Sequence, residues 1–116
     1  MQTRAELSRI NAEINKLPYV AELTDDWRPI DQWGGDCDSY ATAKMLALYK
    51  AGWSADVMRL AECTIPSGGA HCVLLVDCEG ETYVLDNRRP EPVLMENAGY
   101  EWKRIQVAGT PNWEFA

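Results

Sequence analysis

The pattern of apolar positions predicts two helices in the first half of the chain. Residues 3–17 begin with a capping box, Thr3-x-x-Glu6, and continue with apolar residues at helical spacing: Leu7, Ile10, Ile14 and Leu17. Residues 36–51 are rich in alanine and leucine, and Gly52 supplies a C-terminal stop. The first helix carries no visible chemistry, whereas the second begins at a cysteine.

The second half of the chain has the pattern of a β-sheet. Apolar residues alternate or run together in four segments, 55–63, 71–78, 81–86 and 100–107. Residues 18–35 predict a loop with one short helical turn over 30–33, and 87–99 predict a surface connection. Helices followed by antiparallel strands indicate an α+β fold, in which the helix over 36–51 packs on the sheet. We expect one domain over residues 1–116.

Charge and composition limit the kinds of binding partner that we expect. The 116 residues include 18 acidic and 11 basic side chains, so the net charge is −7, and basic residues form no cluster. Phosphate binding needs such a cluster, so we expect no nucleic-acid partner. No segment reaches the roughly 18 apolar residues of a membrane span. We expect no membrane association, no organic cofactor and a monomer.

The four cysteines do not predict disulfides or a zinc site. The N-terminus lacks the pattern of an export signal, so we expect reduced thiols and a cytoplasmic or phage-associated protein, periplasmic only if a signal has been removed. Cys72 and Cys78 lie about 20 Å apart on one predicted strand and cannot bridge each other. The single His71 directly precedes Cys72, a spacing unlike that of zinc ligands.

Three polar residues stand at positions that suit nucleophilic catalysis. Cys37 opens the second helix, His71 begins a predicted strand, and Asp86 ends the next one. A hairpin turning at Glu79-Gly80 would pair residues whose numbers sum to 159. His71 and Asp86 would then be diagonal neighbours on one face, within reach of each other. A thiol, an imidazole and an orienting carboxylate are the parts of an acyl-transfer triad.

The same alternation places Cys72 and Cys78 on the face opposite His71, where we expect them to pack as buried thiols. Nothing visible activates Cys63. The aromatic residues Trp33, Trp53 and Trp102 predict core packing, with a substrate groove as the alternative.

The aspartates beside Cys37 oppose this interpretation. Negative charges at Asp36 and Asp38 disfavour a thiolate, so the helix N-terminus and His71 must offset them. The two carboxylates can instead cap the helix or hold a cation. An oxyanion would be held by the backbone N–H of Cys37 and a second donor, for which the candidates are Gln32, Trp33 and Trp27.

Three motifs together resemble the bacterial transglutaminase-like cysteine peptidases. They are GDCDSYATAK at the second helix, AHCVLLV on one strand and YVLDN on the next, and they keep their spacing over about residues 10–107. The resemblance implies a papain-like or transglutaminase-like core. It also implies that Cys37 is the nucleophile, His71 the general base and acid, and Asp86 the orienting carboxylate.

The family's well-studied members are periplasmic, calcium-dependent proteases that cleave a cell-surface adhesin. By that resemblance Asp36 and Asp38 contribute to a calcium site, although Ser39 replaces an acid that many relatives have. Further oxygen ligands would come from backbone, water, Asp25, Asp26 or Asp31. The missing acid leaves calcium binding open, and the short chain without an export signal favours a phage-encoded or intracellular enzyme.

The predicted function is therefore a cysteine peptidase that acts on a protein or peptide through a thioester. Transglutamination or deamidation of glutamine uses the same thioester and stays open as an alternative. A non-catalytic calcium-binding or virion interaction domain of the same fold is the alternative from another class.

Overall fold

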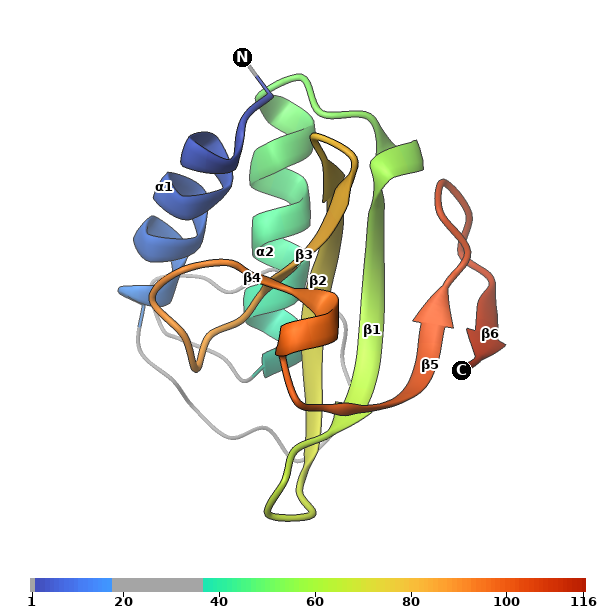
Figure 1. Cartoon of the computed structure of the whole chain (residues 1–116). Helices are drawn as coiled ribbons and strands as arrows, with labels where there is room; N and C mark the ends of the chain where they lie inside the picture. The colour runs from blue at the N-terminus through green and yellow to red at the C-terminus, as the bar shows by residue number, and fades with distance from the viewer. Residues whose placement is uncertain (1, 18–36) are drawn as a thin grey trace.

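Two helices cover one face of a six-stranded antiparallel sheet in the computed structural model (Figure 1). The structure describes residues 2–17 and 37–116. The loop predicted over 18–35 and its helical turn lie outside these residues. The strand order is β4-β3-β2-β1-β5-β6, and every neighbouring pair is antiparallel. This arrangement confirms the predicted α+β fold.

The first helix, α1 (Arg4–Asn15), begins at the predicted cap. The side chain of Thr3 accepts a hydrogen bond from the backbone N–H of Glu6 at 3.4 Å. The Glu6 carboxylate does not complete a capping box but accepts a hydrogen bond from the indole N–H of Trp53. This bond joins α1 to the segment that follows the second helix.

The second helix, α2 (Cys37–Lys50), begins at the predicted nucleophile. It ends where Gly52 adopts φ 102°, a left-handed conformation that glycine adopts without steric cost. The backbone N–H of Trp53 then returns to the carbonyl of Leu48 at 3.0 Å.

The sheet matches the predicted strands with three differences. Its strands are β1 (Met58–Thr64), β2 (Ala70–Cys78), β3 (Glu81–Leu85), β4 (Val93–Leu94), β5 (Glu101–Gln106) and β6 (Trp113–Phe115). Residues 55–57, predicted as strand, form the 3-10 turn η1 (Ala55–Val57), because the Ser54 hydroxyl caps it at the N–H of Asp56. The connection 87–99 contains β4 and the 3-10 turn η2 (Met95–Asn97), and β6 was not predicted.

The hairpin of β2 and β3 has the predicted register. Leu74 lies opposite Leu85, and Cys78 lies opposite Glu81, so paired numbers sum to 159. Glu79 and Gly80 form the two-residue turn with φ values of 54° and 81°. Positive φ at both positions is the feature of the tight turns that match strand twist. This register fixes the position of Asp86, directly after β3, relative to His71 on β2.

Buried apolar residues form one cluster on each face of the sheet. The helix-facing cluster joins Leu7 of α1 and Leu48 of α2 to alternate residues of the strands, including Leu74 and Val76. The cluster on the opposite face contains Val73, Leu75 and Val84, and Trp102 packs against it. Trp53 is 2% exposed, so its predicted core packing is confirmed, whereas Trp102 is half-buried. Trp33 lies outside the described residues.

The described part of the chain contains no helix that is long and apolar enough to cross a membrane.

Replacing Leu74 by alanine tests the helix-facing cluster. Leu74 is fully buried, so we expect Leu74→Ala to lower the free energy of unfolding by about 2–5 kcal/mol, the range for removing a core leucine. Leu46 is 40% exposed on α2, and Leu46→Ala is the matched control with a much smaller effect. Urea unfolding followed by tryptophan fluorescence measures both variants. Equal losses in the two would contradict the assignment of the core.

Candidate active site

Cys37 is the first residue of α2 and is half-buried. A helix N-terminus carries unsatisfied backbone N–H groups and a partial positive charge, which favour a thiolate there. The four cysteines are all free thiols, as predicted.

His71 and Asp86 are in direct contact across the hairpin. The Nε2 atom of His71 lies 2.7 Å from Oδ1 of Asp86, and the side chains are 6% and 0% exposed. The diagonal placement predicted from the register is therefore confirmed. Because Nε2 is engaged by Asp86, Nδ1 is the ring nitrogen left for proton exchange with Cys37.

The Asp86 carboxylate has further donors that sequence reasoning missed. The hydroxyl of Tyr100 donates to Oδ2, and the backbone N–H of Arg88 donates to Oδ1 at 2.9 Å. Burial alone raises the pKa of Asp86, but the hydrogen bonds from His71, Tyr100 and Arg88 outweigh it and lower the pKa. Asp86 is thus a buried carboxylate that stays ionised, as an orienting group must.

Tyr100 also packs against the imidazole of His71. Their ring centroids are 5.7 Å apart in an edge-to-face arrangement. Tyr100 precedes β5, which pairs with β1 and not with the hairpin that carries His71 and Asp86. No spacing along the sequence signals this contact, because it depends on how the connection after β4 returns to the sheet.

Cys37 has a strongly lowered pKa. A hydrogen bond with the Cys72 thiol is the largest cause and lowers it, burial raises it, and the hydrogen bond and charge of His71 lower it, giving a pKa of about 5. The structure therefore brings Cys37 together with both His71 and Cys72, and the environment favours the thiolate at neutral pH.

The prediction that Cys72 is only a packing thiol is wrong. Cys72 is half-buried, and its hydrogen bond to Cys37 raises the pKa of Cys72 well above the ordinary range. By strand alternation it shares the helix-facing side of β2 with Leu74. Cys78 packs in the core as predicted. Cys63 is buried, and burial raises its pKa to about 12, so nothing activates it.

His71 is arranged to carry a proton at neutral pH. Burial is the largest influence and favours the neutral ring, but the hydrogen bonds and charges of Asp86 and Cys37 together raise the pKa of His71 to about 9. Lowered pKa at Cys37 and raised pKa at His71 describe a thiolate–imidazolium pair. Such a pair can attack a carbonyl carbon and then protonate a leaving amine.

Asp38 is the one predicted calcium ligand that the structure describes. Its side chain is 2% exposed, and its Oδ1 accepts a hydrogen bond from the backbone N–H of Ser39 at 3.1 Å. Within residues 2–17 and 37–116, no group of three or more His, Cys, Asp or Glu side chains is arranged to hold a metal ion. The other predicted ligand, Asp36, and the oxyanion candidates Gln32, Trp33 and Trp27 lie outside the described residues.

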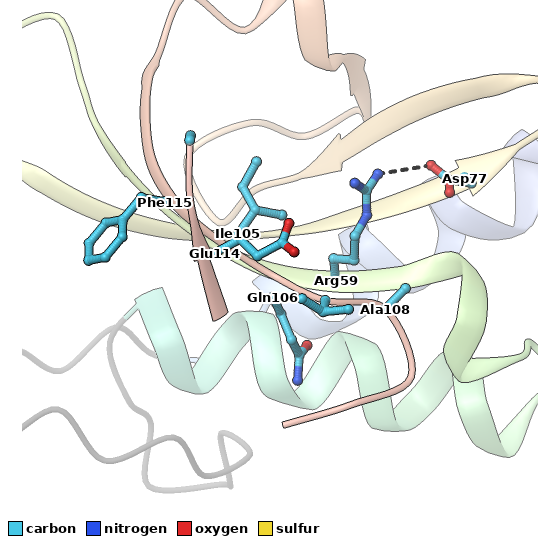
Figure 2. A pocket seen from close by; sticks show the side chains of 9 residues that line it. Arg59, Asp77, Ile105, Gln106, Ala108, Glu114 and Phe115 are labelled. Atoms are coloured by element: carbon cyan, nitrogen blue, oxygen red, sulfur yellow. Dashed lines mark hydrogen bonds and ion pairs between the residues drawn. The ribbon is translucent and has the colours of Figure 1, made fainter. Parts of the chain in front are cut away.

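A surface pocket of about 410 Å³ lies elsewhere on the molecule (Figure 2). Arg59 and Asp77 line it and form an ion pair at 3.1 Å, and Ile105, Gln106 and Phe115 contribute from β5 and β6. None of the residues around Cys37 lines this pocket. It is therefore separate from the candidate active site.

Replacing Asp86 by asparagine tests the cause of the raised histidine pKa. We expect Asp86→Asn to lower the pKa of His71 from about 9 toward 6.5. Burial favours the neutral ring, and the variant lacks the carboxylate charge that stabilises the protonated ring. The chain has one histidine, so proton NMR reports its titration without overlap. Asp77→Asn, which removes a half-exposed carboxylate far from His71, is the control.

Asp86→Asn should also change how the free energy of unfolding depends on pH. A pKa higher in the folded than in the unfolded state stabilises the fold fully below about pH 6.5, and this stabilisation is lost as the pH rises through about 9. Asp86→Asn should remove most of this slope. An unchanged histidine titration in Asp86→Asn would contradict the assignment of Asp86 as the main partner.

Comparison with solved structures finds LapG of Legionella pneumophila in three forms. One LapG structure has a TM-score of 0.80 at 20% identity, covering 97% of this chain and 68% of LapG. A calcium-bound form has a TM-score of 0.77 at 21% identity, covering 93% and 70%, and an EGTA-treated form has 0.74 at 20%, covering 97% and 71%. At these identities the likeness establishes the fold. A search of curated proteins found no match.

A family model described as bacterial transglutaminase-like cysteine proteinase matches residues 1–114. The match spans nearly the whole chain and includes Cys37, His71 and Asp86. The chain therefore belongs to the bacterial transglutaminase-like cysteine proteinase family.

Proposed function

We propose that this protein is a cysteine peptidase in which Cys37 is the nucleophile, His71 the general base and acid, and Asp86 the orienting carboxylate. The observation that carries the proposal is the 2.7 Å contact of two buried side chains, His71 and Asp86, beside a thiol at a helix N-terminus. A buried imidazole held by a carboxylate has one free ring nitrogen, which suits proton exchange with that thiol.

The reaction begins with the thiolate of Cys37 and the imidazolium of His71. The sulfur attacks the carbonyl carbon of a peptide bond, and the imidazolium proton passes to the departing amine as the C–N bond breaks. The acyl group is then held as a thioester. Neutral His71 takes a proton from water, the resulting hydroxide attacks the thioester carbonyl, and the acid leaves as the thiolate is restored.

Negative charge on the carbonyl oxygen needs donors during both steps. The backbone N–H of Cys37 is the first, because helix N-terminal amides lack intrahelical partners. Gln32, Trp33 and Trp27 remain the proposed sources of the second donor.

We also propose a calcium site that includes Asp36 and Asp38. The buried Asp38 carboxylate fits this role, because an ionised group at that depth gains from a neighbouring cation. One relative of the same fold, LapG, has been solved in a calcium-bound form. When bound, calcium would neutralise the acidic groups that flank Cys37.

Alkylation of the native protein tests the activated thiol. With limiting iodoacetamide, we expect Cys37 to react first, at a rate that changes little between pH 6 and 8, because a thiol with a pKa of about 5 is already ionised. An ordinary thiol would react about 100-fold faster at pH 8 than at pH 6. Mass spectrometry of the peptides locates the adduct.

Cys63, Cys72 and Cys78 are internal controls in the same molecule. If Cys37 reacts no faster than these three, the peptidase proposal fails and the non-catalytic alternative gains support. Repeating the reaction with EGTA and then with added calcium tests the metal. We expect Cys37 to react more slowly in EGTA and to regain its original rate when calcium is added. An unchanged rate would contradict the calcium site.

Cleavage of a bacterial proteome tests the class of reaction. We expect incubation with the wild-type protein to create new peptide N-termini, which amine labelling and mass spectrometry detect. Cys37→Ala, which removes the sulfur and leaves His71 and Asp86, is the matched control and should create none. Incorporation of an added amine into glutamine side chains, or their deamidation, without new termini would overturn proteolysis in favour of the alternative chemistry.

A further inference from the structure

Tyr100 contacts two members of the proposed triad, although it lies on neither of their strands. It stands between η2 and β5, and its side chain is half-buried. Its hydroxyl donates a hydrogen bond to Oδ2 of Asp86. Its ring packs edge to face on the imidazole of His71, with the ring centroids 5.7 Å apart and the planes at 80°. One side chain therefore contacts both the proposed general base and its orienting carboxylate.

The hydroxyl of Tyr100 completes the hydrogen bonding of the Asp86 carboxylate. Oδ1 lies 2.7 Å from Nε2 of His71 and accepts from the backbone N–H of Arg88 at 2.9 Å. Oδ2 accepts from Tyr100. Turning the plane of the carboxylate would weaken hydrogen bonds at both oxygens, because each hydrogen bond depends on its direction. The hydroxyl therefore keeps Oδ1 directed at the imidazole.

The ring of Tyr100 restrains the plane of the imidazole. The χ2 torsion of histidine has broad minima, so the packing around the ring must select its orientation. The edge-to-face contact with Tyr100 limits this torsion, because aromatic pairs favour a defined geometry. Since Nε2 is directed at Asp86, a fixed ring plane also fixes the direction of Nδ1. Nδ1 is the nitrogen that exchanges a proton with Cys37 in the proposed mechanism.

Tyr100 is itself held by two neighbours. The guanidinium of Arg89 lies over its ring, 5.3 Å from the centroid, and also donates to the carbonyl of Ala98 at 2.6 Å. The ring of Trp102 contacts Tyr100 edge to face at a centroid distance of 6.0 Å. Burial and the neighbouring Asp86 carboxylate raise the pKa of Tyr100, so the hydroxyl keeps the proton that it donates.

We propose that Tyr100 is a positioning residue for the Asp86–His71 pair. Its hydroxyl sets the direction of the Asp86 carboxylate, and its ring sets the plane of the imidazole and shields the hydrogen bond between them from water. This role rests on the proposed function, because Tyr100 acts on Cys37 only through His71.

Two substitutions of Tyr100 separate the hydroxyl from the ring. Tyr100→Phe removes the hydroxyl and keeps the ring, whereas Tyr100→Leu removes both. We expect new peptide N-termini to appear from the bacterial proteome about tenfold more slowly with Tyr100→Phe and about 100-fold more slowly with Tyr100→Leu, as small misplacements of a catalytic group produce. Tyr49→Phe, which removes a 62% exposed hydroxyl on α2, is the matched control and should keep the wild-type rate.

The single histidine gives a second measurement that reports the position of its ring. In protein labelled with ¹⁵N-histidine, the Nε2–H group that faces Asp86 gives a proton–nitrogen NMR correlation. This group is present both in the protonated ring and in the neutral tautomer that donates to Asp86. We expect a slowly exchanging correlation in the wild type, a shifted one in Tyr100→Phe, and its loss through exchange with water in Tyr100→Leu.

Leu75→Ala separates positioning from a general loss of stability. Leu75 is fully buried in the cluster against which Tyr100 packs, so the variant should unfold at lower urea concentration. We expect it to keep the wild-type cleavage rate and Nε2–H correlation under conditions in which it is folded.

Slower cleavage together with a changed Nε2–H correlation in Tyr100→Phe supports the proposal. A wild-type cleavage rate in Tyr100→Phe, or slower cleavage with an unchanged correlation, overturns it. An equal loss of rate in Leu75→Ala also overturns it, because loosened packing would then be a sufficient cause. If the wild-type protein creates no new termini, the proposed function fails, whereas the NMR comparison still decides whether Tyr100 holds the imidazole.

Discussion

The buried Asp86 carboxylate is the charge on which the candidate site depends. At 0% exposure an isolated carboxylate would take up a proton, yet hydrogen bonds from His71, Tyr100 and the backbone of Arg88 keep it ionised. These donors come from β2, from the residue before β5 and from the turn after β3. A hydrogen bond to a charged group contributes about 1.5–3 kcal/mol, so the carboxylate helps to fix three separate segments relative to one another.

The parts of this arrangement that the sequence predicts are local. A two-residue turn at Glu79-Gly80 sets the register of the hairpin, and the register alone places His71 and Asp86 on one face. Helical periodicity likewise finds α1 and α2 to within about two residues. The strands β4 and β6 have two and three residues, too few for alternation to show, and their pairing depends on an existing sheet edge. The alternating pattern includes residues 55–57, but these residues form a 3-10 turn because the Ser54 side chain caps it.

The parts that the sequence does not predict join segments distant in the chain. Tyr100 reaches Asp86 only because the connection after β4 crosses the face of the sheet opposite the helices, which no periodicity records. Cys72 was placed on the correct face, but strand alternation says nothing of which helix residue it meets there. Asn15 holds the carbonyl of Asp86 from a helix that otherwise has the pattern of a packing element. Each contact depends on the relative position of whole elements, which follows from packing and not from local pattern.

The aspartates beside the thiol are compatible with a reactive cysteine once all the charges are considered together. His71 carries a positive charge beside Cys37, the Cys72 thiol donates to the sulfur, and the first turn of α2 contributes its backbone N–H groups. Asp38 draws on the same N–H groups, because its carboxylate accepts from Ser39. The imidazolium of His71 offsets the charge of the thiolate, whereas no ion pair joins the Asp38 carboxylate to a basic side chain in the described part of the chain. A cation held by these carboxylates, as in the proposed calcium site, would favour the thiolate as well. The flanking aspartates therefore hinder nucleophilicity only while their charge is left uncompensated.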